Sequence, residues 1–275
     1  MKKHKMKKSV GIFAMLAVAI GLLVFSSIGG ARAALTIESQ TYESDIKMRQ
    51  IGISLLENGK PVSRRNYSGN KEWDEDTGEL LTEIEKFEFG TKYPEALSVK
   101  NTGQPITYRD RYNPAKTETL EAIDEYVILT IRKYWVDENN NKRTDLDPSL
   151  IQVKLRDPQE GDAGKWIADT KIMNNEPERI VMIYDTILGP GDETVAATES
   201  ITVDSAIKAV VEKVEEKEID GVRTIITTYS YDGLKFVLEA EAEGVQTHNA
   251  ADAIRSAWGR QVTIDPNTKK ITAIN

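Results

Sequence analysis

Cysteine is absent from this 275-residue sequence, and histidine is nearly absent, with only His4 and His248. Without cysteine the chain has no disulfide, no thiolate zinc site, no iron–sulfur cluster and no thiol nucleophile. The motifs HExxH, GxSxG, GxGxxG and the Walker loop are also missing. The 44 acidic residues are too numerous for one carboxylate pair to stand out as a glycosidase site. We therefore expect no catalytic residues and a protein that is not an enzyme.

The first 33 residues have the three parts of a secretory signal peptide. Residues 1–8 contain five lysines and no acid, residues 10–25 are an apolar run, and Ala31-Arg32-Ala33 is a small-x-small cleavage site. The alternative is an uncleaved membrane anchor, which needs roughly 20 apolar residues and so a longer run than this one. We expect cleavage between Ala33 and Ala34, with the membrane contacted only through the uncleaved signal.

The charge of the chain changes with this cleavage. Residues 1–33 contain six basic residues and no acid, so their removal changes the formal net charge from −8 to −14. A domain this acidic has no electrostatic attraction to phosphate backbones or anionic lipid surfaces, which excludes nucleic acid as a partner. Export without cysteine is typical of a Gram-positive bacterium, and we expect the protein in the extracellular matrix or at the cell surface.

Residues 34–275 are predicted to be mostly short β-strands. The strongest segment, 126–136, is apolar on both faces, which predicts a central strand. Asn58-Gly59 and Asp232-Gly233 each predict a hairpin turn. The other strand candidates alternate apolar and polar residues or are rich in β-branched ones: 51–55, 96–101, 149–155, 166–169, 179–188, 200–203, 222–231, 235–243, 261–264 and 270–274. We expect a mostly β fold, an antiparallel jelly-roll-like β-sandwich with a few short helices.

The irregular and helical segments complete the predicted domain. Residues 63–82 are polar without periodicity and predict a long surface loop. Helices are expected over 118–124, 203–213 and 249–258. The third helix is followed by a hairpin, and together they form the C-terminal segment of the domain at about 249–275. Thr247 or Asn249 is expected to cap that helix, His248 to pack at its start, Trp258 to lie in the core and Gly259 to end it.

One loop has oxygen ligands suited to a weak calcium site. Asp137, Asn139, Asn141 and Asp145 place side-chain oxygens mostly at every second residue, as a calcium loop does. Lys142 stands where an EF-hand needs glycine, and the twelfth position lacks glutamate. The alternative is a solvated hairpin loop with Asx turns. The cofactor prediction is therefore none, with calcium as the open alternative.

Five segments of the chain resemble those of one family. They are residues 10–18 with the cleavage site, residues 96–103 (ALSVKNTG), residues 125–135 (EYVILTIRKYW), residues 188–194 (LGPGDET), and residues 245–254 (VQTHNAADAI) followed by Trp258-Gly259. They are similar to those of the TasA/camelysin family, exported Gram-positive proteins that a SipW-type signal peptidase processes.

The resemblance implies a jelly-roll sandwich and a secreted structural role, as a subunit of biofilm-matrix fibres or of a cell-surface layer. In TasA-like fibres a strand exposed by signal cleavage completes the sheet of the next subunit. Here that donor strand is residues 34–42, in which Leu35 and Ile37 alternate with polar residues. The implied partners are the SipW-type peptidase during export, further copies of this chain and related matrix proteins. The protease activity described for camelysin-like proteins is not expected, because HExxH is absent.

Two alternatives stay open. A monomeric cell-surface module that binds polysaccharide or calcium would use the same fold without polymerising. A sortase-assembled pilin would need a lysine after Tyr93-Pro94, where Glu95 stands, and a wall-sorting tail. Filaments from a chain that begins at Ala34 are expected for the fibre subunit, and a monomer with a calcium-dependent melting shift for the binding module.

Overall fold

The computed structural model describes residues 51–67, 73–82, 84, 87–109, 113, 115–209, 211–219, 222–229, 231 and 233–275. The chain divides into two compact units, 1–48 and 49–275. The predicted cleavage site, with Ala31, Ala33 and Ala34, and the predicted donor strand, with Leu35 and Ile37, lie outside the described residues. The second unit is therefore described by itself.

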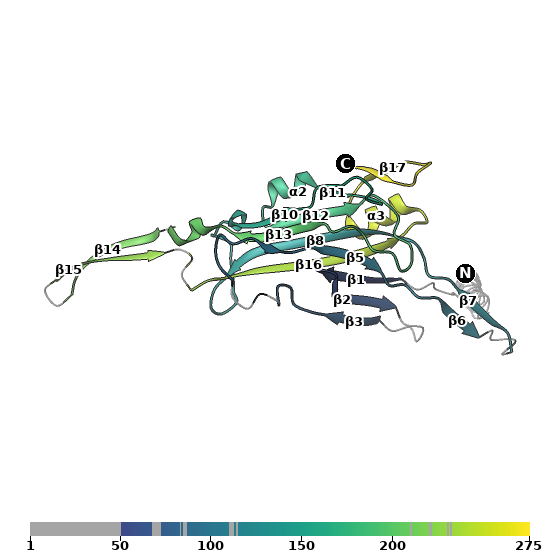
Figure 1. Cartoon of the computed structure of the whole chain (residues 1–275), viewed down its shortest axis with the longest axis horizontal. Coiled ribbons are helices and arrows are strands. Elements are labelled where there is room, and N and C mark those ends of the chain that lie inside the picture. Colours follow the sequence, from purple (N-terminus) through teal and green to yellow (C-terminus); the bar gives the residue numbers. More distant parts are fainter. Residues whose placement is uncertain are drawn as a thin grey trace, which may run out of the picture. The chain divides into compact units, whose positions relative to one another are not determined.

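This unit is mostly β, with antiparallel sheets and few helices (Figure 1). Its central strand, β8 (Glu125–Val136), pairs with β12 (Arg179–Tyr184) on one side and with β16 (Lys235–Gln246) on the other. The short strand β11 (Trp166–Ala168) pairs with β12, and β9 (Lys142–Arg143) pairs with the end of β8. The prediction of a central strand over 126–136 is confirmed.

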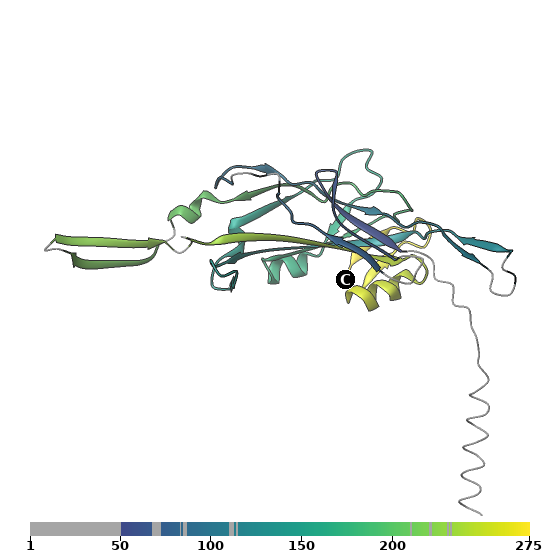
Figure 2. The ribbon, with the colours of Figure 1, turned by 90° about the horizontal axis from the view of Figure 1, so that it is seen from below.

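Both faces of this sheet are covered, because successive side chains of a strand point to opposite faces. Leu129 and Ile131 of β8 belong to the main apolar cluster, whereas Tyr126 and Ile128 belong to a second one. The second face is covered by four elements (Figure 2): α2 (Thr170–Asn175), α3 (Ala250–Trp258), β17 (Val262–Ile264) and β18 (Ile271–Ile274). The double covering explains why β8 is apolar on both faces.

A second sheet has the order β3-β2-β1-β5, and its strands are β3 (Trp73–Thr77), β2 (Lys60–Tyr67), β1 (Gly52–Glu57) and β5 (Leu97–Asn101). The hairpin predicted at Asn58-Gly59 is confirmed, since β1 and β2 pair across it. Asn58 has φ 50° and Gly59 φ 78°, the two left-handed positions of a type I′ turn.

The prediction of a long surface loop over 63–82 is wrong. In β2, Ser63 and Arg64 lie opposite Leu55 and Ser54 of β1, and β3 pairs with β2 from Tyr67 back to Ser63. The buried strand β1 holds β2 in place through backbone hydrogen bonds, which need no apolar periodicity in the outer strands. The polar sequence therefore concealed two strands.

A third sheet, with the order β10-β13-β4, completes the main core. Its strands are β10 (Ile151–Leu155), β13 (Thr198–Val203) and β4 (Tyr93–Pro94). Side chains of all three sheets meet in one cluster, among them the fully buried Leu97, Val99, Leu129, Ile131, Ile151 and Ile201. Burial of each such side chain contributes about 1.5–3 kcal/mol. Sheets that share one core in this way are consistent with a β-sandwich.

Two further hairpins are present where the sequence predicts helices or another strand pairing. β6 (Ile106–Arg109) pairs with β7 (Thr117–Leu120), and β14 (Val211–Ile219) pairs with β15 (Val222–Tyr229). The helices predicted over 118–124 and 203–213 are therefore wrong, apart from the short 3-10 turn η2 (Ser205–Ala209). The hairpin predicted at Asp232-Gly233 is also wrong, since β15 pairs with β14 and β16 with β8. In each case pairing with a partner strand prevailed over the local signal.

The C-terminal helix and hairpin lie where the sequence predicts them, and Gly259 ends α3. Asn249 precedes the helix in a left-handed conformation and makes no side-chain capping bond, so the predicted cap by Asn249 is wrong. His248 is exposed, whereas Trp258 is partly buried against the second cluster. Within the described ranges, no helix has the length and apolarity needed to cross a membrane.

The attachment of α3 depends on Ile254, which is fully buried in the second cluster. We predict that Ile254→Ala lowers the free energy of unfolding by about 2–4 kcal/mol, because it leaves a cavity under the helix. The exposed Ser256→Ala on the same helix is the control and changes it by less than about 0.5 kcal/mol. Urea unfolding followed by tryptophan fluorescence measures both. Equal effects of the two substitutions would show that α3 is not held by this contact.

Candidate functional site

A groove of about 580 Å³ lies between β16 and the β1–β2 hairpin. Leu55 of β1 and Val62 of β2 form one wall, and residues 236–240 of β16 form the other. The segment that follows β3 closes a third side through Leu80, Leu81, Ile84 and Phe87. Most of the lining residues are therefore apolar, although polar atoms make up about half of the exposed lining surface, and the walls come from three separate stretches of the chain.

The groove runs along the edge of β16 rather than across its face. Consecutive residues from Phe236 to Ala240 line it, whereas the face of a strand presents only every second residue. β16 is the last strand of its sheet, and among the described strands it pairs with β8 alone. The other edge of β16 therefore offers backbone N–H and C=O groups to the groove.

Side-chain contacts fix the position of β16. On its outer face, Glu239 accepts a hydrogen bond from the Tyr134 hydroxyl at 2.7 Å, and Glu241 pairs with Arg132 at 3.2 Å. Burial, with the neighbouring Glu239 carboxylate, raises the pKa of Tyr134 to about 12. At the groove end, Phe236 packs on Phe87 with ring centroids 4.7 Å apart. β16 is thus held firmly while one of its edges has no strand partner among the described residues.

A buried carboxyl group lies between β8, β1 and β16. It stands at the end of the β8–β16 pair that is remote from the groove. The fully buried Glu125 of β8 accepts a hydrogen bond from the Gly52 N–H at 3.3 Å, and its second oxygen has no partner among the described residues. Gly244 of β16 is necessary beside it, because a Cβ there would collide with this carboxyl group. Burial raises the pKa of Glu125 to about 8, although the Gly52 hydrogen bond acts in the opposite direction.

The raised pKa of Glu125 predicts that the protein is more stable in mild acid. Between pH 4.5 and 8 the folded state holds a proton that the unfolded state has lost, so the free energy of unfolding falls as pH rises through this range. We expect Glu125→Gln to remove on the order of 3 kcal/mol of this fall between pH 5 and 8.5. Urea unfolding at both pH values measures it. An unchanged slope in the variant would contradict the assignment of the proton to Glu125.

The predicted calcium loop uses its carboxylates internally. The Asp137 carboxylate accepts the N–H groups of Asn139 and Asn141, both at 2.8 Å, and the Asn141 side-chain amide at 3.0 Å. Asp145 makes two bonds to the Arg143 guanidinium, at 2.8 and 2.7 Å, which lowers the pKa of Asp145 to about 2. This is an Asx-turn loop. Across the described ranges, no group of three or more His, Asp or Glu side chains could hold a metal ion.

This loop leads us to expect no calcium-dependent stabilisation. Millimolar calcium and a chelator should leave the melting temperature within about 1 °C of each other, because a ligand stabilises the folded state only by binding it. Differential scanning fluorimetry makes the comparison, with magnesium as the control for ionic strength. A melting temperature that rises by several degrees with calcium but not with magnesium would show that the loop binds calcium.

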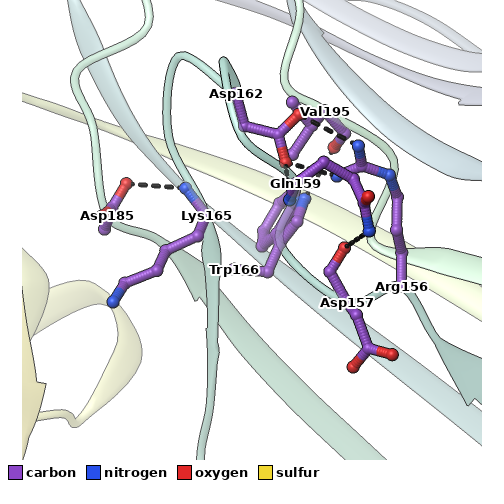
Figure 3. A network of polar contacts seen from close by, with 8 residues as sticks. All are labelled: Arg156, Asp157, Gln159, Asp162, Lys165, Trp166, Asp185 and Val195. Atoms are coloured by element: carbon purple, nitrogen blue, oxygen red, sulfur yellow. Dashed lines mark hydrogen bonds and ion pairs between the residues drawn. The ribbon is translucent and has the colours of Figure 1, made fainter.

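A polar network around Arg156 is structural (Figure 3). The Arg156 guanidinium faces the Asp162 carboxylate with N–O distances of 2.7 and 2.9 Å, and the Gln159 N–H donates to the same carboxylate. Trp166 donates its indole N–H to the Val195 carbonyl at 2.8 Å. These bonds hold residues 156–166 against the neighbouring strands, and the Asp162 carboxylate is fully engaged in them.

Sequence reasoning missed the groove, because its walls come from distant parts of the chain and one wall lies in the predicted loop 63–82. It also missed Glu125, since no local pattern distinguishes a buried acid from an exposed one. The calcium-loop residues are neighbours, but Asp137 is bonded to Asn139 and Asn141, and Asp145 is bonded to Arg143. The sequence matches no model of a known protein family, no curated protein and no solved structure.

Proposed function

We propose that the protein is a secreted structural protein, a subunit of extracellular biofilm-matrix fibres or of a cell-surface layer, and no enzyme. It polymerises when the N-terminal strand of one copy enters the groove of the next and completes a jelly-roll-like sandwich. The observation that supports this is the groove itself, a slot with mostly apolar lining residues along a strand edge that lacks a partner among the described residues.

The groove has room for about five of the nine residues of the N-terminal strand, and the side-chain pattern of that strand suits it. The edge that lines it covers five residues of β16, which a strand of about 17 Å would span. In residues 34–42, Leu35 and Ile37 are spaced to point to one side. Pairing with β16 satisfies backbone groups on both strands, while Leu35 and Ile37 cover partly exposed apolar lining residues such as Leu80 and Phe236.

Export would control the timing of this assembly. Cleavage between Ala33 and Ala34 frees the strand only after the chain has crossed the membrane. Before cleavage the same strand is tethered to the apolar segment 10–25, so copies cannot donate it to one another in solution. A SipW-type peptidase would therefore act on each copy before the copy joins a fibre.

The first test uses the strand. We expect the protein that begins at Ala34 to form filaments, and the double variant Leu35→Asp, Ile37→Asp to remain monomeric, because charged groups cannot enter an apolar slot. Thr36→Asp, on the opposite side of the strand, is the matched control and should still assemble. Electron microscopy and sedimentation measure the outcome. Filaments of the double variant would refute strand donation.

The second test uses the groove. Ala240→Phe fills the slot at a partly buried lining position and should reduce assembly at least tenfold, and the melting temperature of the variant shows whether its fold is retained. Ala257→Phe, at an exposed position of α3, is the control for added bulk. If Ala240→Phe assembles like the wild type, the groove is not the acceptor.

A further inference from the structure

Two buried carboxyl groups are linked to the wall of the groove. Glu57 ends β1, and Glu95 precedes β5, the strand that pairs with β1. Glu57 is 8% exposed and Glu95 is fully buried. Glu57 accepts the N–H of Leu81 at 2.7 Å, and Leu81 is one of the residues that line the groove. One member of the acid pair therefore holds the wall directly.

The backbone of Leu81 is stabilised by this hydrogen bond to Glu57. Its φ of 64° is left-handed, a conformation that is strained for a residue with a Cβ. The hydrogen bond to the Glu57 carboxylate offsets this strain, since bonds to charged acceptors are the stronger ones. With Leu81 fixed, its side chain and that of Leu80 pack against the main core and shape the slot. The groove wall depends on Glu57 staying in place.

Glu95 lies in a site that disfavours its charge. Neither oxygen of its carboxyl group has a hydrogen-bond partner among the described residues. Burial, and then the charge of Glu57, raises the pKa of Glu95 to about 8. From β13, Glu199 meets Glu95 only through its backbone, and its carboxylate is paired with Lys92 and Lys154 at 2.6 and 2.7 Å. Glu79, on the groove wall, is exposed. Lys60 lies opposite Glu57 in the β1–β2 register, and the pKa of Glu95 is raised despite this nearby cation.

We propose that Glu57 and Glu95 form a proton-controlled latch on the acceptor groove. While Glu95 carries its proton, Glu57 holds Leu81 and the slot keeps the shape that an incoming strand requires. Loss of that proton places two negative charges together in a buried site, so Glu57 moves toward solvent, Leu81 relaxes from its left-handed conformation, and the wall opens. The latch regulates the site of the proposed function and rests on it. Assembly should then be efficient at neutral and mildly acidic pH and weak in alkaline conditions.

The first experiment follows assembly of the protein that begins at Ala34 by light scattering at pH 7 and pH 9. The wild type should assemble about tenfold more slowly at pH 9, one unit above the pKa of about 8. Glu95→Gln is neutral at both pH values and should remove this difference. Glu160→Gln, an exposed acid far along the chain, is the control and should behave like the wild type. An equal slowing in Glu95→Gln would overturn the latch and leave strand donation intact.

The second experiment needs no polymer and so separates the two proposals. In the monomeric Leu35→Asp, Ile37→Asp protein, amide exchange of Leu81 is measured at both pH values and divided by the intrinsic rate at each. The protection of Leu81 should fall about tenfold from pH 7 to pH 9, and adding Glu95→Gln should abolish the fall. Constant protection of Leu81 in the double variant that retains Glu95 would overturn the latch even if the protein that begins at Ala34 forms filaments. Failure to form filaments at any pH would instead count against the proposed function.

Discussion

The fold depends on β8 being buried on both faces and paired along both edges. Its side chains alternate between two apolar clusters, so one strand joins the main core to the layer made by α2, α3 and the C-terminal hairpin. All twelve residues of β8 also pair with β16. Because β8 uses the inner edge of β16 completely, the arrangement leaves the outer edge of β16 as the boundary of the sheet.

That boundary explains why a groove occurs here. An exposed sheet edge invites uncontrolled pairing, and proteins usually protect it with charge or cover it. β16 carries Glu239 and Glu241 on one face, whereas the residues of the other face decrease in size from Phe236 through Leu238 to Ala240. The edge between them is enclosed by the β1–β2 hairpin and the segment around Leu81. In the proposed assembly this edge accepts one extended strand that has apolar side chains on one side.

The sequence was informative where a pattern is local. The double-sided apolar run of β8, the type I′ turn at Asn58-Gly59 and the C-terminal helix were all predictable from short-range signals. The hairpin β2–β3 was not, because its polar strands depend on the neighbouring strand β1. Nor was the true partner of β16, since Asp232-Gly233 has the composition of a tight turn and only the long-range pairing with β8 decides the outcome.

The candidate site was harder still to predict. Leu55, Leu81 and Phe236 are far apart in the sequence, and nothing in their local patterns places them in one groove. The acids Glu57, Glu95 and Glu125 cannot be told from the many exposed acids until burial is known. Conversely, the alternating oxygens of the loop at 137–145 resembled a metal site, but Arg143 and the backbone N–H groups use them.

The absence of cysteine permits one direct measurement of strand exchange. One protein carries Ile37→Cys and a second carries Ala240→Cys, and the two are mixed under oxidising conditions. If the strand of one copy pairs with β16 of another on the apolar side, disulfide-linked dimers of the two proteins form, and Glu239→Cys on the opposite face forms few. Filaments without a disulfide at position 240, or equal cross-linking at 239 and 240, would contradict the account.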